Sequence, residues 1–159
     1  MSLVGFGTVK AVLSGDTLLL VGKSKNGPPP TRQLSLAGIK APRLQRSPNA
    51  AADEPFAWAA REHLRKLCIG QVVKFTMAYR VAAINRDFAD IVMKDGTNLA
   101  KSLVKAGLAK ANPQRDGKQS AHIEDLQRLA GDAEIAGHGV WSSGATANSI
   151  RNVKVTSNQ

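Results

Sequence analysis

Hydrophobic and polar positions alternate in short runs over the first forty residues, as is typical of β-strands. The runs are Thr8–Leu13, Thr17–Val21 and Arg32–Ile39. A glycine-containing turn, Ser14-Gly15-Asp16, separates the first two runs and favours an antiparallel hairpin. Three prolines in Asn26–Pro30 remove three backbone donors and predict a stiff, exposed loop before the third run. The pattern therefore predicts three consecutive strands in a meander.

The spacing of apolar positions changes to that of a helix after residue 52. Asp53 is a suitable N-cap, and Glu54 and Pro55 suit a first helical turn. Apolar side chains then recur on one helical face until Gly70, a residue that often ends helices. We therefore expect a helix over Asp53–Ile69.

The second half of the chain predicts two more strands and two more helices. The strands are expected at Gln71–Tyr79 and Asp87–Met93, because both runs are rich in β-forming residues. A helix is expected from Leu99 to Ala106, ended by Gly107, and a last helix at about Ala121–Ala136. A polar loop over residues 111–121 separates these two helices.

The resulting order is β-β-β-α-β-β-α-α. Five short strands with one helix between the third and fourth are typical of an OB-fold, so we expect an α+β protein built on a barrel of five antiparallel strands. The segregation of strands from helices argues against a doubly wound parallel sheet. We expect this domain to span residues 5–142. Residues 143–159 are expected to be a tail, or a linker toward a further repeat of a longer protein, and Ile150–Val155 is either a strand or part of that linker.

Composition narrows the class of protein. A chain of 159 residues with 43% apolar residues can bury a hydrophobic core without disulfides or metal ions, and it is not expected to be disordered throughout. The single cysteine, Cys68, excludes an internal disulfide and a zinc finger and favours a reduced intracellular setting. No apolar run approaches about 20 residues, and no signal peptide is visible. We therefore expect no membrane partner.

The net charge of +10 favours a polyanionic partner, either nucleic acid or an acidic membrane surface. No acidic residue lies between Asp16 and Asp53. The cations of that stretch are Lys23, Lys25, Arg32, Lys40, Arg43 and Arg46. Aromatic residues make up only 4%, so recognition of a nucleic-acid backbone or duplex shape is favoured over base stacking. The alternative is that the extra lysines only keep the protein in solution.

A second group of cations, Arg61, Arg65 and Lys66, is expected on the exposed side of the first helix. We include Arg61 and Lys66 among the candidate nucleic-acid contacts. An ordinary solvated helix face explains them equally well.

Five motifs occur along the chain in the order typical of a known family. They are Ser14–Thr17, Leu34–Arg43, Asn85–Ala89, Leu99–Ala109 and Gly137–Ser142. Together they resemble the staphylococcal-nuclease domain. The resemblance covers roughly residues 5–155 and implies an OB barrel with helices, in agreement with the pattern above.

Three further segments resemble the first nuclease-like repeat of Tudor-SN proteins. They are Gly27–Gln33, Asp53–Glu62 and Ser149–Lys154. The resemblance implies an RNA-binding domain of a protein that acts in RNA silencing complexes, RNA decay and transcriptional coactivation. It implies a cytoplasmic location, with the nucleus as a second compartment.

Members of the nuclease family hydrolyse phosphodiesters with a calcium ion, a general base and two arginines. By resemblance, Asp16 stands at the first calcium-binding aspartate and Arg86 at the second arginine. Ser35 stands where the first arginine belongs, Lys40 replaces the second metal-binding aspartate, and Arg43 replaces the glutamate base. Because calcium requires several hard oxygen ligands, we expect no cofactor, with Asp16 only a weak calcium candidate. The family's substrate channel would place Lys40 and Arg43 beside Asp16 and Arg86.

Asp16 and Arg86, the two residues that match the family site, each also suit a purely structural role. Asp16 suits a turn aspartate that accepts hydrogen bonds from its own neighbourhood. Arg86 suits an ion pair with Asp87 or Asp90. No small-molecule partner is indicated.

Three functions are therefore compared. The leading one is a non-catalytic domain that binds single- or double-stranded RNA and belongs to a Tudor-SN-type protein. The second is an active nuclease on structured or edited RNA, in which Asp53 or Glu54 joins Asp16 as a metal ligand or a neighbouring repeat completes the site. The third is a module that binds protein components of silencing or transcription complexes.

Overall fold

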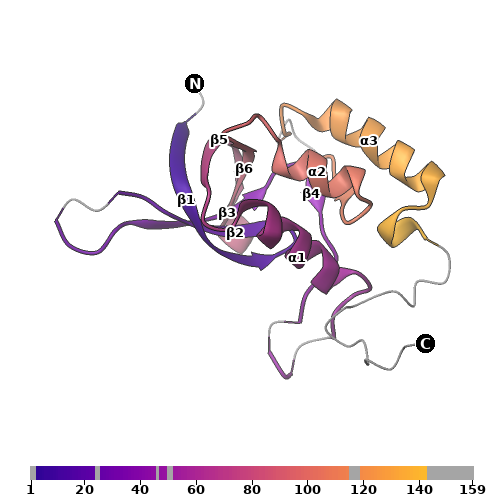
Figure 1. Cartoon of the computed structure of the whole chain (residues 1–159), viewed down its shortest axis with the longest axis horizontal. Coiled ribbons are helices and arrows are strands. Elements are labelled where there is room, and N and C mark those ends of the chain that lie inside the picture. Colours follow the sequence, from indigo (N-terminus) through magenta and orange to yellow (C-terminus); the bar gives the residue numbers. More distant parts are fainter. Residues whose placement is uncertain (1–2, 24–25, 46, 50–51, 115–118, 143–159) are drawn as a thin grey trace.

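The computed structural model describes residues 3–23, 26–45, 47–49, 52–114 and 119–142, and it places three helices on one side of a barrel (Figure 1). The barrel strands are β1 (Val4–Ser14), β2 (Thr17–Val21), β3 (Thr31–Leu36), β5 (Val72–Val81) and β6 (Arg86–Met93). They close in the order β1-β2-β3-β6-β5. The helices are α1 (Ala57–Cys68), α2 (Leu99–Lys105) and α3 (Ile123–Ala136), with short 3-10 turns η1 (Ala82–Ile84) and η2 (Gly139–Trp141). The expected α+β class and the OB barrel are confirmed.

One pair of barrel strands differs from the expected antiparallel arrangement. β3 and β6 run parallel, with Ser35 opposite Phe88 and Leu36 opposite Ala89. Five strands in a closed ring cannot all alternate in direction, so at least one neighbouring pair must be parallel. The prediction of five antiparallel strands is wrong at this pair, because local periodicity carries no information on strand direction.

The run Arg32–Ile39 is two elements rather than one strand. Gly38 has a φ of +84°, and a Cβ there would lie 2.6 Å from Leu126 Cδ1, so the chain turns sharply where it meets α3. After this turn β4 (Ile39–Lys40) leaves the barrel and pairs with β7 (Lys110–Ala111) in a separate two-stranded sheet.

The first helix begins later than expected. Phe56 precedes it in a left-handed conformation (φ 68°), and the helix runs from Ala57. Asp53 is not the N-cap, because its carboxylate accepts a hydrogen bond from the backbone N–H of Gln45 at 2.7 Å. The expected helix end at Gly70 is confirmed, since Gly70 has a φ of +76°.

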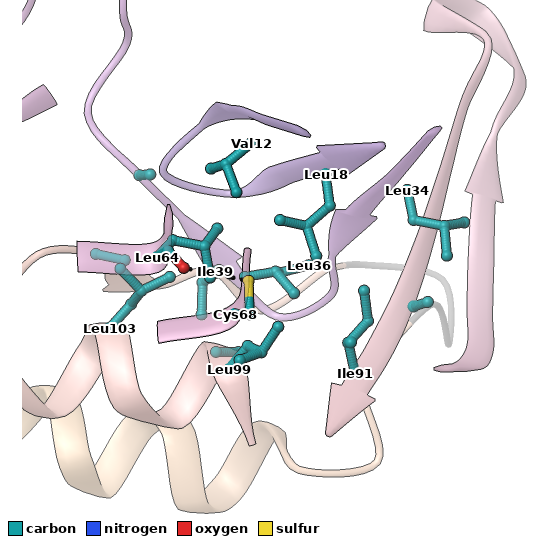
Figure 2. Close-up of a cluster of buried hydrophobic side chains, with 14 of the residues drawn as sticks. Val12, Leu18, Leu34, Leu36, Ile39, Leu64, Cys68, Ile91, Leu99 and Leu103 are labelled. Carbon is teal, nitrogen blue, oxygen red and sulfur yellow. Dashed lines mark hydrogen bonds between the residues drawn. The ribbon is translucent and has the colours of Figure 1, made fainter. Parts of the chain in front are cut away.

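The core lies between the barrel and helices α1 and α2 (Figure 2). Leu36 from β3, Leu64 from α1 and Leu103 from α2 are all fully buried. Cys68 is also fully buried, its Sγ donates to the Leu64 carbonyl at 3.1 Å, and burial raises the pKa of its thiol to about 12. This cysteine is a packing residue. Of the helices described, none combines the length and apolar composition that a bilayer-spanning segment requires. The segment Ile150–Val155 and the rest of residues 143–159 lie outside the described residues.

His63 links α1 to α2, and we expect it to make the stability of the fold depend on pH. Its Nε2 lies 2.9 Å from Ser102 Oγ, and burial lowers the pKa of the imidazole below 6.5. The unfolded chain therefore binds a proton more readily than the folded one, so stability is complete above about pH 6.5 and falls as the pH drops below it. Thermal unfolding at several pH values between about 7.5 and 5.5 should show this decline. His63→Gln should flatten the curve, and an unchanged pH dependence would contradict the assignment.

Candidate functional site

A cleft of about 320 Å³ opens where the β1–β2 turn meets the loop after β4 and the start of β6. We call it the first cleft. Its walls are Ser14, Asp16, Lys40, Ala41, Pro42, Arg43, Leu44 and Arg86. The structure thus brings together four of the five side chains at the family's key positions, three cations and one carboxylate. The fifth, Ser35, does not line the cleft: it is 1% exposed, and its Oγ is 3.3 Å from Thr17 Oγ1.

Asp16 is already engaged at both carboxylate oxygens. Oδ1 accepts hydrogen bonds from Ser14 Oγ at 3.0 Å and Thr17 Oγ1 at 3.1 Å. Oδ2 accepts from the backbone N–H of Ala41 at 3.2 Å. The carboxylate therefore fastens the β1–β2 turn to the loop after β4. Gly15 makes this close approach possible, since a Cβ there would lie only 2.9 Å from the Ala41 Cβ.

Arg43 is bound by the carboxylate of Glu54, a residue that the sequence pattern placed in the first helix. Its backbone N–H donates to Glu54 Oε1 at 2.6 Å, and its Nη1 lies 3.4 Å from Glu54 Oε2. The backbone N–H of Glu54 donates in return to the Arg43 carbonyl. These bonds close the base of the loop between the two residues. Part of the positive charge of Arg43 is therefore compensated, although an exposed pair of this kind contributes little stability.

Arg86 lines the cleft and makes no ion pair with any of the described residues. Asp87 lies next to it in the chain but pairs with Arg80 at 2.8 Å and with Arg32 at 3.9 Å. Asp90 accepts a hydrogen bond from Ser120. The structural alternative for Arg86, an ion pair with either aspartate, is wrong.

The donor set of the first cleft does not fit a calcium ion. Calcium takes six to eight oxygen ligands, chiefly carboxylates, and among the described residues that line this cleft Asp16 is the single carboxylate, against Lys40, Arg43 and Arg86. Glu54 does not line the first cleft. Within the part of the chain that the structure describes, no group of three or more His, Cys, Asp or Glu side chains is placed to hold a metal.

Most of the other predicted contacts lie apart from the first cleft. Lys23 is exposed just after β2, and Lys66 is exposed on α1. Lys25 and Arg46 lie outside the described residues. The prediction that these lysines and arginines contact nucleic acid stays a prediction.

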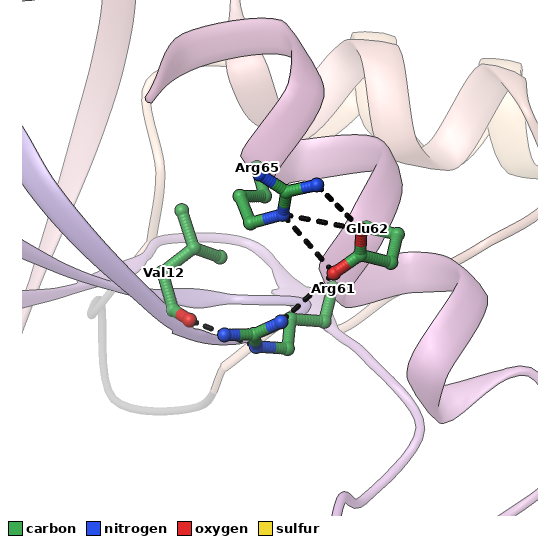
Figure 3. A network of polar contacts seen from close by, with 4 residues as sticks. All are labelled: Val12, Arg61, Glu62 and Arg65. Atoms are coloured by element: carbon green, nitrogen blue, oxygen red, sulfur yellow. Dashed lines mark hydrogen bonds and ion pairs between the residues drawn. The ribbon is translucent and has the colours of Figure 1, made fainter. Parts of the chain in front are cut away.

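Arg61 is part of a polar network that ties α1 to β1 (Figure 3). Its Nε donates to the Val12 carbonyl at 3.0 Å, and its Nη1 lies 2.8 Å from Glu62 Oε2. The guanidinium stacks over the Trp58 ring at 4.9 Å. Arg65 binds the same carboxylate and, by its hydrogen bonds, lowers the pKa of Glu62. Arg61 therefore has a structural role that explains its position without any ligand.

A second cleft, of about 350 Å³, adjoins the first and was missed by sequence reasoning. Its walls are Lys40, Ala41, Pro42, Glu54, Pro55, Ala109, Lys110 and Val140. Three of these, Lys40, Ala41 and Pro42, also line the first cleft. The pairing of β4 with β7 creates this cleft, and strands of two residues leave no periodic signal in the sequence.

Comparison with known proteins identifies similar chains. The family model "Staphylococcal nuclease homologue" matches residues 33–143. The chain is 43% identical over 155 residues to "Ribonuclease TUDOR 2" of Arabidopsis thaliana, which covers 92% of this chain and 15% of that protein. It is 40% identical over 157 residues to "Staphylococcal nuclease domain-containing protein 1" of Drosophila melanogaster, which covers 93% of this chain and 16% of that protein. The chain thus spans about 15% of the length of these curated relatives.

Proposed function

Because the chain belongs to the family of staphylococcal nuclease homologues, we propose that it is a nuclease-like domain that binds RNA through the first cleft without hydrolysing it there. The observation that carries this proposal is the pair of cations Lys40 and Arg86, which line the cleft with no ion pair among the described residues. A phosphate backbone is the partner that such a cleft favours, since each neutralised phosphate releases bound counterions.

The same cleft lacks the groups that hydrolysis requires. An attacking water needs a general base within hydrogen-bond reach, and the family's base position holds Arg43. Asp16, the carboxylate among the described lining residues, already accepts three hydrogen bonds from the protein. The side chains support binding of a phosphodiester better than its cleavage.

The name of one relative, a ribonuclease, belongs to a protein more than six times as long as the aligned segment. An activity of that protein can reside in parts to which this chain does not correspond. For a longer Tudor-SN-type protein that contains this domain we propose a role in RNA silencing or gene regulation, in the cytoplasm and secondarily the nucleus. Under this proposal, the longer protein binds protein components of silencing and transcription complexes.

RNA titrations at several salt concentrations test the proposal. Single- and double-stranded RNAs of unrelated sequence should bind with affinities that fall steeply between about 50 and 200 mM salt, because phosphate contacts dominate. Comparable binding of unrelated sequences supports backbone recognition. Absence of RNA binding at low salt would reject the proposed function, and salt-independent binding would reject the role of the cations.

We further propose that the domain needs no calcium, which gives a second expected result. A ligand that binds only the folded state stabilises it by RT ln(1 + L/Kd), where L is the concentration of free ligand, so the melting temperature rises with that concentration. Because the cleft repels a divalent cation, millimolar calcium should leave the melting temperature of this domain unchanged. A rise of several degrees that Asp16→Asn removes would contradict the assignment. Differential scanning calorimetry with calcium and with a chelator provides the measurement.

A further inference from the structure

We propose that the second cleft binds a neighbouring phosphate of the RNA strand held in the first cleft, with Lys40 and Lys110 on either side of that phosphate. The inference rests on the proposed function and adds to it the course of the strand. Lys40 lies between the two phosphate positions, because it lines both clefts.

The pairing of β4 with β7 sets two like charges directly opposite each other. Lys40 and Lys110 are register partners in this two-stranded sheet, and both are exposed. Like charges at such positions destabilise a sheet, because directly opposed side chains lie about 5 Å apart at Cβ. Neither lysine has an ion pair within the described part of the chain. Glu54 also lines this cleft but binds Arg43. An anion between the two lysines would therefore relieve a repulsion that no ion pair of the described residues offsets.

Lys110 is positioned in advance of any ligand. Its Nζ lies over the Trp141 ring, 4.9 Å from the centroid, in a cation–π contact. The η2 turn that carries this ring is anchored where the Val140 N–H donates to the Gly107 carbonyl at 2.8 Å. A side chain that is already oriented loses less conformational freedom when it binds, so this contact favours a binding role.

The shape of the two clefts favours a single strand over a duplex. They share the segment Lys40–Pro42, so an extended chain passes from one to the other across it. Apart from the charged residues, the second cleft is walled by alanines, prolines and Val140, and the Trp141 ring faces Lys110. Among the lining residues that the structure describes, none is an aromatic stacking platform, so the strand is held by its backbone and sequence preference is weak.

The test compares Lys110→Gln, Lys110→Arg and Lys40→Gln with Lys74→Gln, a control on the exposed face of β5. Binding of a labelled single-stranded RNA of about eight nucleotides and of a mononucleotide is measured at several salt concentrations, and thermal unfolding checks each variant. Lys110→Gln should weaken octamer binding about fivefold and lower the salt slope by about 0.7, the value for one phosphate contact on a single strand. Mononucleotide binding should change less than octamer binding. Lys110→Arg should restore octamer binding, and Lys74→Gln should match the parent.

The outcomes separate this inference from the function on which it rests. If Lys110→Gln binds the octamer like the parent while Lys40→Gln binds it weakly, the second cleft lies outside the RNA path and the proposed function stands. If the parent binds no RNA at low salt, both fail. If Lys110→Gln lowers the affinity for a polyglutamate peptide and leaves RNA binding unchanged, the cleft takes an acidic protein segment and the inference is overturned.

Discussion

Replacing Lys40 and Arg86 together by glutamine is expected to weaken RNA binding about thirtyfold at low salt. Each lost contact between a cation and a phosphate should cost about 1 kcal/mol, the net contribution of an ordinary hydrogen bond, because solvent screens an exposed ion pair. The salt slope should fall by about 1.4 on single-stranded RNA, since two phosphate contacts are lost. Both side chains line the first cleft without an ion pair among the described residues, so the folded state should change little. Fluorescence anisotropy over a salt series measures both quantities.

The matched control for this double variant replaces Lys74 on β5 and Lys94 just after β6 by glutamine, which removes the same net charge from exposed positions outside the first cleft. Its RNA affinity should remain within about threefold of the parent, because only long-range screened attraction is lost. If the control variant loses as much affinity as the cleft variant, the interaction is spread over the basic surface and the first cleft is not the site.

Gly107→Ala is expected to lower the free energy of unfolding by about 2–5 kcal/mol. Gly107 has a φ of +75°, and a left-handed backbone costs a residue with a Cβ about 1–2 kcal/mol. An added Cβ would also lie 2.3 Å from the His138 carbonyl oxygen, which is backbone and must shift. Overpacking of this kind adds about 1–3 kcal/mol. Urea denaturation measures the loss.

Gly131→Ala is the matched control within α3. Nothing lies within 4 Å of a Cβ at that position. Alanine there should raise stability by about 0.5–1 kcal/mol, because glycine in a helix interior is unfavourable. Equal effects of the two substitutions would contradict the close backbone contact between Gly107 and the segment His138–Gly139.

Much of the fold follows from local sequence signals because its elements bury one face at a regular period. The first hairpin lies where the turn Ser14-Gly15-Asp16 places it, and Asn98 caps α2 by accepting a hydrogen bond from the Lys101 N–H at 3.0 Å. The start of α1 was mistaken because Asp53 and Glu54 suit a helix N-terminus but bind a loop eight to eleven residues earlier. Capping propensity describes an isolated helix and cannot detect a competing donor brought in by the fold.

The candidate site was predictable only where a sequence motif carried it. The gathering of Lys40, Arg43 and Arg86 around Asp16 followed from the resemblance to the nuclease family. The engagement of Arg43 by Glu54 and the register of Lys40 with Lys110 did not, since both depend on long-range contacts without periodicity. Charge counting treats all exposed cations alike, whereas the structure separates those that line a cleft from those that stabilise the fold, such as Arg61.

The most direct test of the central claim, an RNA-binding cleft that no longer hydrolyses, reads binding and cleavage in one experiment. The purified domain is incubated with end-labelled single- and double-stranded RNA, with millimolar calcium or with a chelator, and the samples are divided between native and denaturing gels. The expected result is the same salt-dependent shift under both conditions and intact RNA throughout. RNA cleavage that requires calcium and is abolished by Asp16→Asn would contradict the claim.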